Sequence, residues 1–100
     1  MNRKVQTALE KALIDWDMMQ KTNDEDSEEV AERFEKHFYE FIDEVKEWYQ
    51  SLQLKPQDII EAEEMAEVII IQGQLPGPLQ LNFLTELEFI IEGIERTRFD

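Results

Sequence analysis

The sequence predicts an all-α fold, an antiparallel four-helix bundle with helices over about residues 3–22, 27–52, 56–72 and 79–98. Two observations support this prediction. Apolar residues recur at steps of three and four along most of the chain, which is the spacing of amphipathic helices. The 100 residues include only three Gly and three Pro, too few for the many turns of a β fold. This length predicts a single domain over residues 1–100.

The first two helices follow from continuous apolar stripes. In residues 3–22 the stripe consists of Val5, Leu9, Ala12, Leu13, Trp16 and Met19. In residues 27–52 it consists of Val30, Phe34, Phe38, Phe41, Val45, Trp48 and Leu52. The second stripe alternates steps of four and three, which suits packing against neighbouring helices at a shallow angle. Asp26 or Ser27 is expected to cap the second helix, because short oxygen-bearing side chains accept the free N–H groups of a first turn.

The third and fourth helices are separated by a loop rich in Gly and Pro at residues 72–78. Pro56 suits the first position of the third helix. Residues 68–71, Val-Ile-Ile-Ile, are apolar on every side of a helix, so we expect them to be buried on several sides. The fourth helix has its own stripe of Phe83, Leu84, Leu87, Ile90, Ile91 and Ile94.

The charge is strongly acidic and unevenly distributed. The chain has 24 acidic and 10 basic residues, a net charge of −14. Residues 1–22 have a net charge of +1, whereas residues 23–29 have a net charge of −5. This charge argues against direct nucleic-acid binding, which needs cations facing phosphates. It suits a protein partner with a basic surface, although a Glu-rich solvated helix surface explains most of it.

Several classes of site are excluded by composition. The chain has no cysteine, which removes disulfides, zinc–thiolate sites and thiol catalysis. No apolar run approaches the roughly 18 residues of a membrane span, and no apolar segment follows the basic N-terminus, so a cytoplasmic location without membrane contact is expected. We expect the single histidine, His37, to be a structural residue paired with Glu40 or Glu44. No catalytic residue, metal ligand or cofactor is predicted.

One acidic segment supports a metal hypothesis as an alternative. The sequence Glu-Glu-Val-Ala-Glu at residues 28–32 resembles the Glu-Glu-x-x-Glu element of the all-α nucleoside-triphosphate pyrophosphohydrolases. The resemblance implies a magnesium-dependent nucleotide hydrolase, and carboxylates three residues apart on a helix can share a hard cation. The second element of that family, Glu-x-x-Asp, occurs here only from Glu40 to Asp43. It falls on the same predicted helix, whereas the family brings it from another helix.

The leading hypothesis is a small acidic protein-binding or regulatory module without catalytic activity. Its candidate contact residues are the acidic link and two tyrosines of the second helix: Asp24, Glu25, Asp26, Glu28, Glu29, Tyr39 and Tyr49. A second alternative is an acidic inhibitor that mimics nucleic acid, which requires the carboxylates to line up on one continuous surface. Some apolar residues lie off the main stripes, namely Tyr39, Ile42, Tyr49, Ile60, Val68 and Ile71. If exposed they form a patch of the kind found at interfaces, which leaves room for a homodimer.

Overall fold

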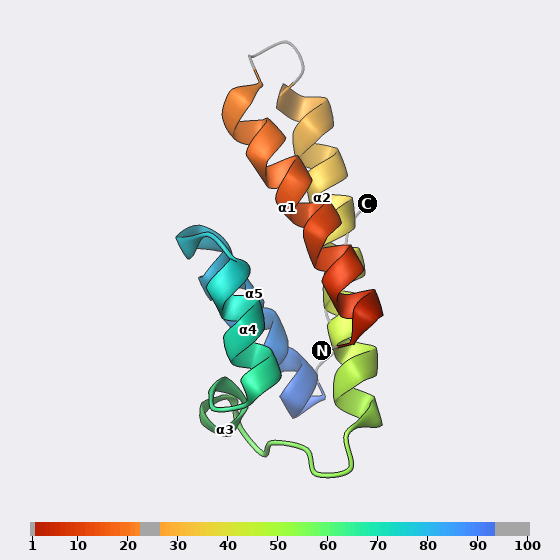
Figure 1. The fold of residues 1–100 in the computed structure, drawn as a ribbon, viewed down its shortest axis with the longest axis vertical. Helices are drawn as coiled ribbons and strands as arrows, with labels where there is room; N and C mark the ends of the chain where they lie inside the picture. Colours follow the sequence, from red (N-terminus) through yellow and green to blue (C-terminus); the bar gives the residue numbers. More distant parts are fainter. Residues whose placement is uncertain (1, 23–26, 94–100) are drawn as a thin grey trace. The chain divides into compact units, whose positions relative to one another are not determined.

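The computed structural model describes residues 2–22 and 27–93, and within these residues it contains five helices and no strand. The helices are α1 (Arg3–Lys21), α2 (Ser27–Ser51), α3 (Ile59–Glu63), α4 (Ala66–Gln74) and α5 (Gly77–Glu92) (Figure 1). The all-α prediction is therefore confirmed. The chain divides into two compact units, residues 1–48 and residues 49–100. The four-helix bundle and the single domain remain predictions.

The first unit is a helical hairpin in which α1 and α2 run antiparallel (Figure 1). Both helices begin and end within one residue of their predicted bounds. Asn2 caps α1, because its side chain accepts a hydrogen bond from the N–H of Lys4 at 2.7 Å. Trp16 of α1 lies against Phe34 of α2, with ring centroids 5.5 Å apart. The buried apolar core of the unit consists of Ile42, which lies off the predicted stripes, and of eight residues from those stripes: Val5, Leu9, Ala12, Val30, Phe38, Phe41, Val45 and Trp48.

The second unit departs from prediction, because the single helix expected over residues 56–72 is two helices. Met65 adopts an extended conformation (φ −72°, ψ 139°) and separates α3 from α4. Ala62 and Ile71 are both almost fully buried, yet nine residues of continuous helix would turn them to opposite sides. The break allows both to reach the core. Pro56 also does not begin the helix as predicted.

The link between α4 and α5 is shorter than the predicted loop at residues 72–78. Only Leu75 and Pro76 lie outside the two helices. The side-chain amide of Gln80 on α5 donates a hydrogen bond to the carbonyl of Gln72 on α4 at 2.8 Å, which joins the two helices.

α5 ends at Gly93, whose positive φ of 73° is the left-handed conformation that favours glycine at a helix end. Residues 94–98 of the predicted fourth helix lie outside the described residues.

The burial of off-stripe apolar residues differs from expectation. Val68 and Ile71 are buried, and so is Ile42, whereas the sequence suggested that they could form an exposed patch. Ile69 and Ile70 were expected to be buried with their neighbours, but they are 57% and 49% exposed. The reason is that α4 has one inner face only, which Val68 and Ile71 fill, with Leu75 buried directly after the helix. Among the described residues, no helix combines the length and the apolar character needed to cross a membrane.

Candidate interaction surface

The outer side of α2 gathers exposed carboxylates. The seven exposed carboxylates of α2 are Glu28, Glu29, Glu32, Glu35, Glu40, Asp43 and Glu47. At 100° per residue they fall within an arc of about 140°, on the side away from the buried stripe, and they extend over about 28 Å of helix. We call these seven residues the carboxylate face of α2. One basic residue, Lys36, is exposed within the same arc.

Repulsion between like charges is built into this face. Carboxylates three or four residues apart on a helix destabilise it slightly, and Glu28, Glu32 and Glu35 have this spacing. None of these three side chains forms a hydrogen bond or ion pair with another residue in the described parts of the chain. Farther along α2, a hydrogen bond with the Glu47 carboxyl raises the pKa of Glu44, and burial and repulsion from Glu47 add to the effect. The face is therefore more negative than the stability of the helix alone would favour.

The structure places four of the seven predicted contact residues, and it brings two of them together. Glu28 and Glu29 are exposed in the first turn of α2, as expected, and form one end of the carboxylate face. Tyr39 is half-buried beside Phe38, with ring centroids 5.8 Å apart. Tyr49 is also half-buried, about 31 Å along the helix from Glu28. The other three, Asp24, Glu25 and Asp26, lie outside the described residues.

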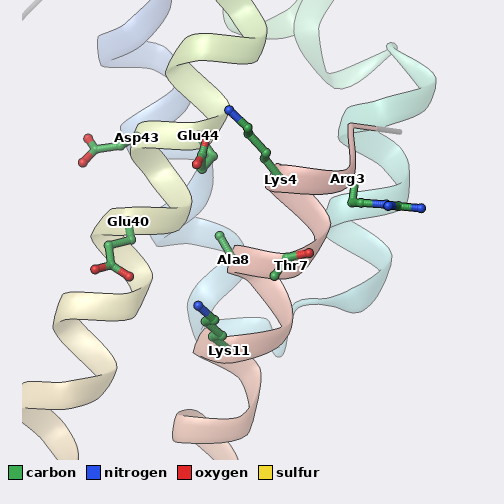
Figure 2. Close-up of a pocket in the computed structure, with 8 residues that line it drawn as sticks. All are labelled: Arg3, Lys4, Thr7, Ala8, Lys11, Glu40, Asp43 and Glu44. Atoms are coloured by element: carbon green, nitrogen blue, oxygen red, sulfur yellow. The ribbon is translucent and has the colours of Figure 1, made fainter.

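A cleft of 520 Å³ lies between α1 and α2, close to the N-terminus of α1 (Figure 2). Its volume falls in the range of small-molecule sites. Residues of both helices line the cleft. α1 contributes Arg3, Lys4, Thr7, Ala8 and Lys11, three of which are cations, and α2 contributes Glu40, Asp43 and Glu44. In Figure 2 the side chains of Lys4 and Lys11 extend towards α2, whereas Arg3 points away from it.

Electrostatic attraction crosses this cleft. The pKa of Glu44 is raised overall, mainly by Glu47, but the charge of Lys4 acts in the opposite direction, so these two side chains attract each other across the cleft. Arg3 and Lys4 occupy the first turn of α1, where the helix dipole disfavours positive charge. The attraction to α2 offsets this cost and supports the hairpin. The same arrangement could hold a small ligand that carries both signs of charge.

Arg3, Lys4 and Lys11 are not among the contact residues predicted from the sequence. The signal was the net charge of +1 over residues 1–22, the one segment in which basic residues outnumber acidic ones. At helical spacing, Lys4 and Lys11 are seven residues apart and share a face of α1.

A cluster around the buried carboxylate of Asp15 joins α1 to α2 in the other half of the hairpin. The carboxylate of Asp15 is only 6% exposed, accepts a hydrogen bond from Nε of Arg33 at 3.2 Å, and contacts Nδ1 of His37. The terminal guanidinium nitrogen of Arg33 also approaches the sulfur of Met18 at 3.7 Å. We call Asp15, Arg33 and His37 the Asp15 cluster. It can act as a structural link, because a carboxylate held by an imidazole and a guanidinium fixes the register of the two helices.

The predicted partners of His37, Glu40 or Glu44, are wrong. His37 lies on the edge of α2 that meets α1, so its carboxylate comes from Asp15 on the other helix. A signal for Asp15 was present in the sequence. It stands three residues after Ala12 and four before Met19, on the buried stripe of α1.

The carboxylates of the metal hypothesis are separated along α2. Glu28, Glu29 and Glu32 lie in its first turns, whereas Glu40 and Asp43 line the cleft. Within residues 2–22 and 27–93, no three His, Asp or Glu side chains are placed to hold a metal ion.

The chain was compared with protein-family models, with curated proteins and with solved structures, and none of them matches it. The carboxylate face, the cleft and the Asp15 cluster are therefore the features on which a function can rest.

Proposed function

We propose that this chain is a small protein-binding or regulatory module of the cytoplasm, without catalytic activity, which binds a partner with a basic surface through the carboxylate face of α2. The observation that supports this proposal is the alignment of seven exposed carboxylates on one side of the helix. Complementary charge of this kind accelerates association and selects partners.

The carboxylate face has a cost in helix stability. Like charges at helical spacing weaken α2, and solubility alone would be served by carboxylates spread over all exposed surfaces. A basic partner neutralises the repulsion between these carboxylates when it binds, and the loss of this repulsion makes the free energy of binding more favourable. In the sequence, Asp24, Glu25 and Asp26 immediately precede the face and add three carboxylates to the proposed contact.

The proposal can be tested by affinity capture from the native lysate with three forms of the chain. The first is the wild type, and the second carries Glu28→Gln, Glu32→Gln and Glu35→Gln. The third is a matched control that loses three exposed carboxylates of α3 and the residue after it, Glu61→Gln, Glu63→Gln and Glu64→Gln. The last two have the same net charge, and Gln at position 61 can still accept the N–H of Gln57, so the main difference between them is where charge is removed.

We expect a partner that is retained by the wild type and by the α3 control but lost with the α2 variant. Its affinity should fall between about 0.05 and 0.2 M salt, because salt screens exposed charges. A partner held equally by both variants would contradict a contact through the carboxylate face, and indifference to salt would contradict its electrostatic nature.

A second candidate function is the nucleic-acid-mimicking inhibitor. The same observation favours it, because seven of the exposed carboxylates share one face about 28 Å long, although further exposed carboxylates lie on α1, α3 and α5. The two candidates differ in what the captured partner does. A mimic displaces DNA or RNA from its partner, so adding this chain to the partner's preformed nucleic-acid complex should release the nucleic acid. A module that binds elsewhere on the partner leaves the complex intact.

A further inference from the structure

The cleft between α1 and α2 is lined by equal numbers of opposite charges. Its lining contains three cations and three carboxylates: Arg3, Lys4, Lys11, Glu40, Asp43 and Glu44. All the cations come from α1 and all the carboxylates from α2, so each helix supplies one sign. We propose that this cleft binds a small zwitterion, an ω-amino acid whose carboxylate contacts the cations of α1 and whose ammonium contacts the carboxylates of α2.

Small residues of α1 form the hollow of the cleft. Thr7 and Ala8 lie one helical turn after Lys4 and one turn before Lys11, so these four residues share one side of the helix. Figure 2 shows Thr7 and Ala8 between the two lysines. The methyl group of Ala8 and the methylene stems of the lysines supply apolar surface beside the charged groups. This lining suits a ligand with a short hydrocarbon chain between its charged ends.

The balance of charge favours a zwitterion over a simple ion. An anion is attracted by the lysines, but it is repelled by the carboxylates of α2 and by the net charge of −14. A cation is attracted by the carboxylates of α2, but it is repelled by the lysines. An ω-amino acid gains attraction from both helices, and because it is neutral overall the net charge of the chain does not repel it.

The two lysines are available to a ligand. In Figure 2 their side chains extend towards α2. Within residues 2–22 and 27–93, neither Lys4 nor Lys11 forms a hydrogen bond or an ion pair with another residue, and Lys4 attracts Glu44 only from a distance.

The spacing of the helices determines the kind of amino acid. Axes of packed helices lie about 8–10 Å apart, and the two charged groups of an α-amino acid are attached to the same carbon, too close together to reach both helices. A chain of several carbons separates them enough. Because the site needs the lysines of α1, which are not part of the carboxylate face, this inference does not depend on the proposed function.

Amide chemical shifts of the isotope-labelled full chain test this proposal. Three ligands have hydrocarbon chains of the same length: ε-aminohexanoate carries both charges, hexanoate only the carboxylate, and hexylamine only the ammonium. Each is added up to about 20 mM, a concentration that detects millimolar binding. The titrations are done near neutral pH and at about 0.02 M salt, where exposed charges are weakly screened.

Two variants and a matched control locate the site. Lys4→Gln with Lys11→Gln removes two cations of the cleft, and Ala8→Leu fills the hollow without changing the charge. The control, Lys21→Gln with Lys55→Gln, removes two exposed cations that do not line the cleft, and it has the same net charge as the first variant. Circular dichroism verifies that each protein is folded.

We expect ε-aminohexanoate to shift amides of residues 4–11 and 40–44, with a dissociation constant on the order of 1 mM, as for other weak ligands of this size. Hexanoate and hexylamine should bind about tenfold more weakly, because each is attracted by one helix and repelled by the other. Both variants should weaken the binding of ε-aminohexanoate by about tenfold, and the control should retain it.

Three results would overturn the proposal. The first is the absence of a saturable shift with ε-aminohexanoate. The second is a shift of the same amides by hexanoate or hexylamine with equal affinity, because one sign of charge would then suffice. The third is binding that the control loses as much as the lysine variant, because the cations of the cleft would then have no special role.

Discussion

Asp15 connects the two long helices through a single carboxylate. A buried charge is tolerated when hydrogen bonds and opposite charge surround it, and Asp15 has an ion pair with Arg33 and a contact with the His37 ring. All three residues come from the hairpin, two of them from α2 at i and i+4. The stripe of α1 predicts that position 15 is buried, but only the folded hairpin shows which side chains of α2 meet it.

We predict that Asp15→Asn lowers the free energy of unfolding by about 1–2 kcal/mol, because hydrogen bonds to a charged group contribute more than neutral ones. This value lies at the lower end of the usual range for hydrogen bonds to a charged group, because Arg33 is 41% exposed and solvent screens its charge. Urea unfolding measures the change.

Asp17→Asn is the matched control for that measurement. Asp17 pairs with Lys21 on the same helix at 2.9 Å, but both side chains are exposed. Its loss should cost less than about 0.5 kcal/mol. Equal costs for the two substitutions would show that burial of Asp15 contributes nothing to the strength of its cluster.

The ionisation of Glu44 makes the free energy of unfolding depend on pH, and the raised pKa of this residue gives the direction of the dependence. Its pKa is raised in the folded state, first by the hydrogen bond with Glu47 and then by burial and repulsion, so the folded chain holds the proton more tightly than the unfolded chain. This contribution to stability is complete at low pH and is lost as pH rises through the raised folded pKa. We predict that Glu44→Gln unfolds less readily than the wild type near pH 7, with the difference shrinking towards pH 4. Urea unfolding at several pH values measures it, and a difference that grows towards low pH would contradict the sign.

At the scale of elements, α1 and α2 were predictable and the second unit was not. The stripes of α1 and α2 repeat for about twenty residues, and such periodicity depends little on the rest of the fold. The break at Met65 is different, because the residues on both sides are helix-forming and no Gly or Pro marks it. It arises from the need to bury Ala62 and Ile71 together, which is a tertiary requirement. For the same reason the sequence could not assign exposure within residues 68–71.

The start of α3 did carry a local signal, which leads to a prediction for this element. The Asp58 side chain accepts the N–H of Glu61 at 2.9 Å, and the Glu61 side chain accepts the N–H of Gln57, which closely resembles a capping box. We predict that Asp58→Ala destabilises the chain by about 1 kcal/mol and speeds amide exchange at Glu61, whereas Asp58→Ser retains most of the stability. Exchange that is unchanged in the Ala variant would show that the cap does not hold this turn.

At the scale of the whole molecule, composition predicted the class of fold and the negative sign of the net charge, but not how the charged residues are arranged on the surface. The alignment of carboxylates on α2 follows from helical spacing and was open to sequence analysis. The cleft that the cations of α1 line together with Glu40, Asp43 and Glu44 was not, because it depends on the relative register of two helices. The molecule thus combines repulsion along α2 with attraction between α1 and α2.

The balance of these two effects can be measured with salt. A net charge of −14 destabilises a compact chain through self-repulsion, and raising salt from about 0.01 to 0.15 M shortens the screening length from about 30 to 8 Å. We predict that the free energy of unfolding rises over this range, because exposed carboxylates outnumber the cations that face them. The variant with Glu28→Gln, Glu32→Gln and Glu35→Gln should respond less, since part of the repulsion has been removed. Stability that falls with salt would mean that attraction across the cleft and within the Asp15 cluster outweighs repulsion along the carboxylate face.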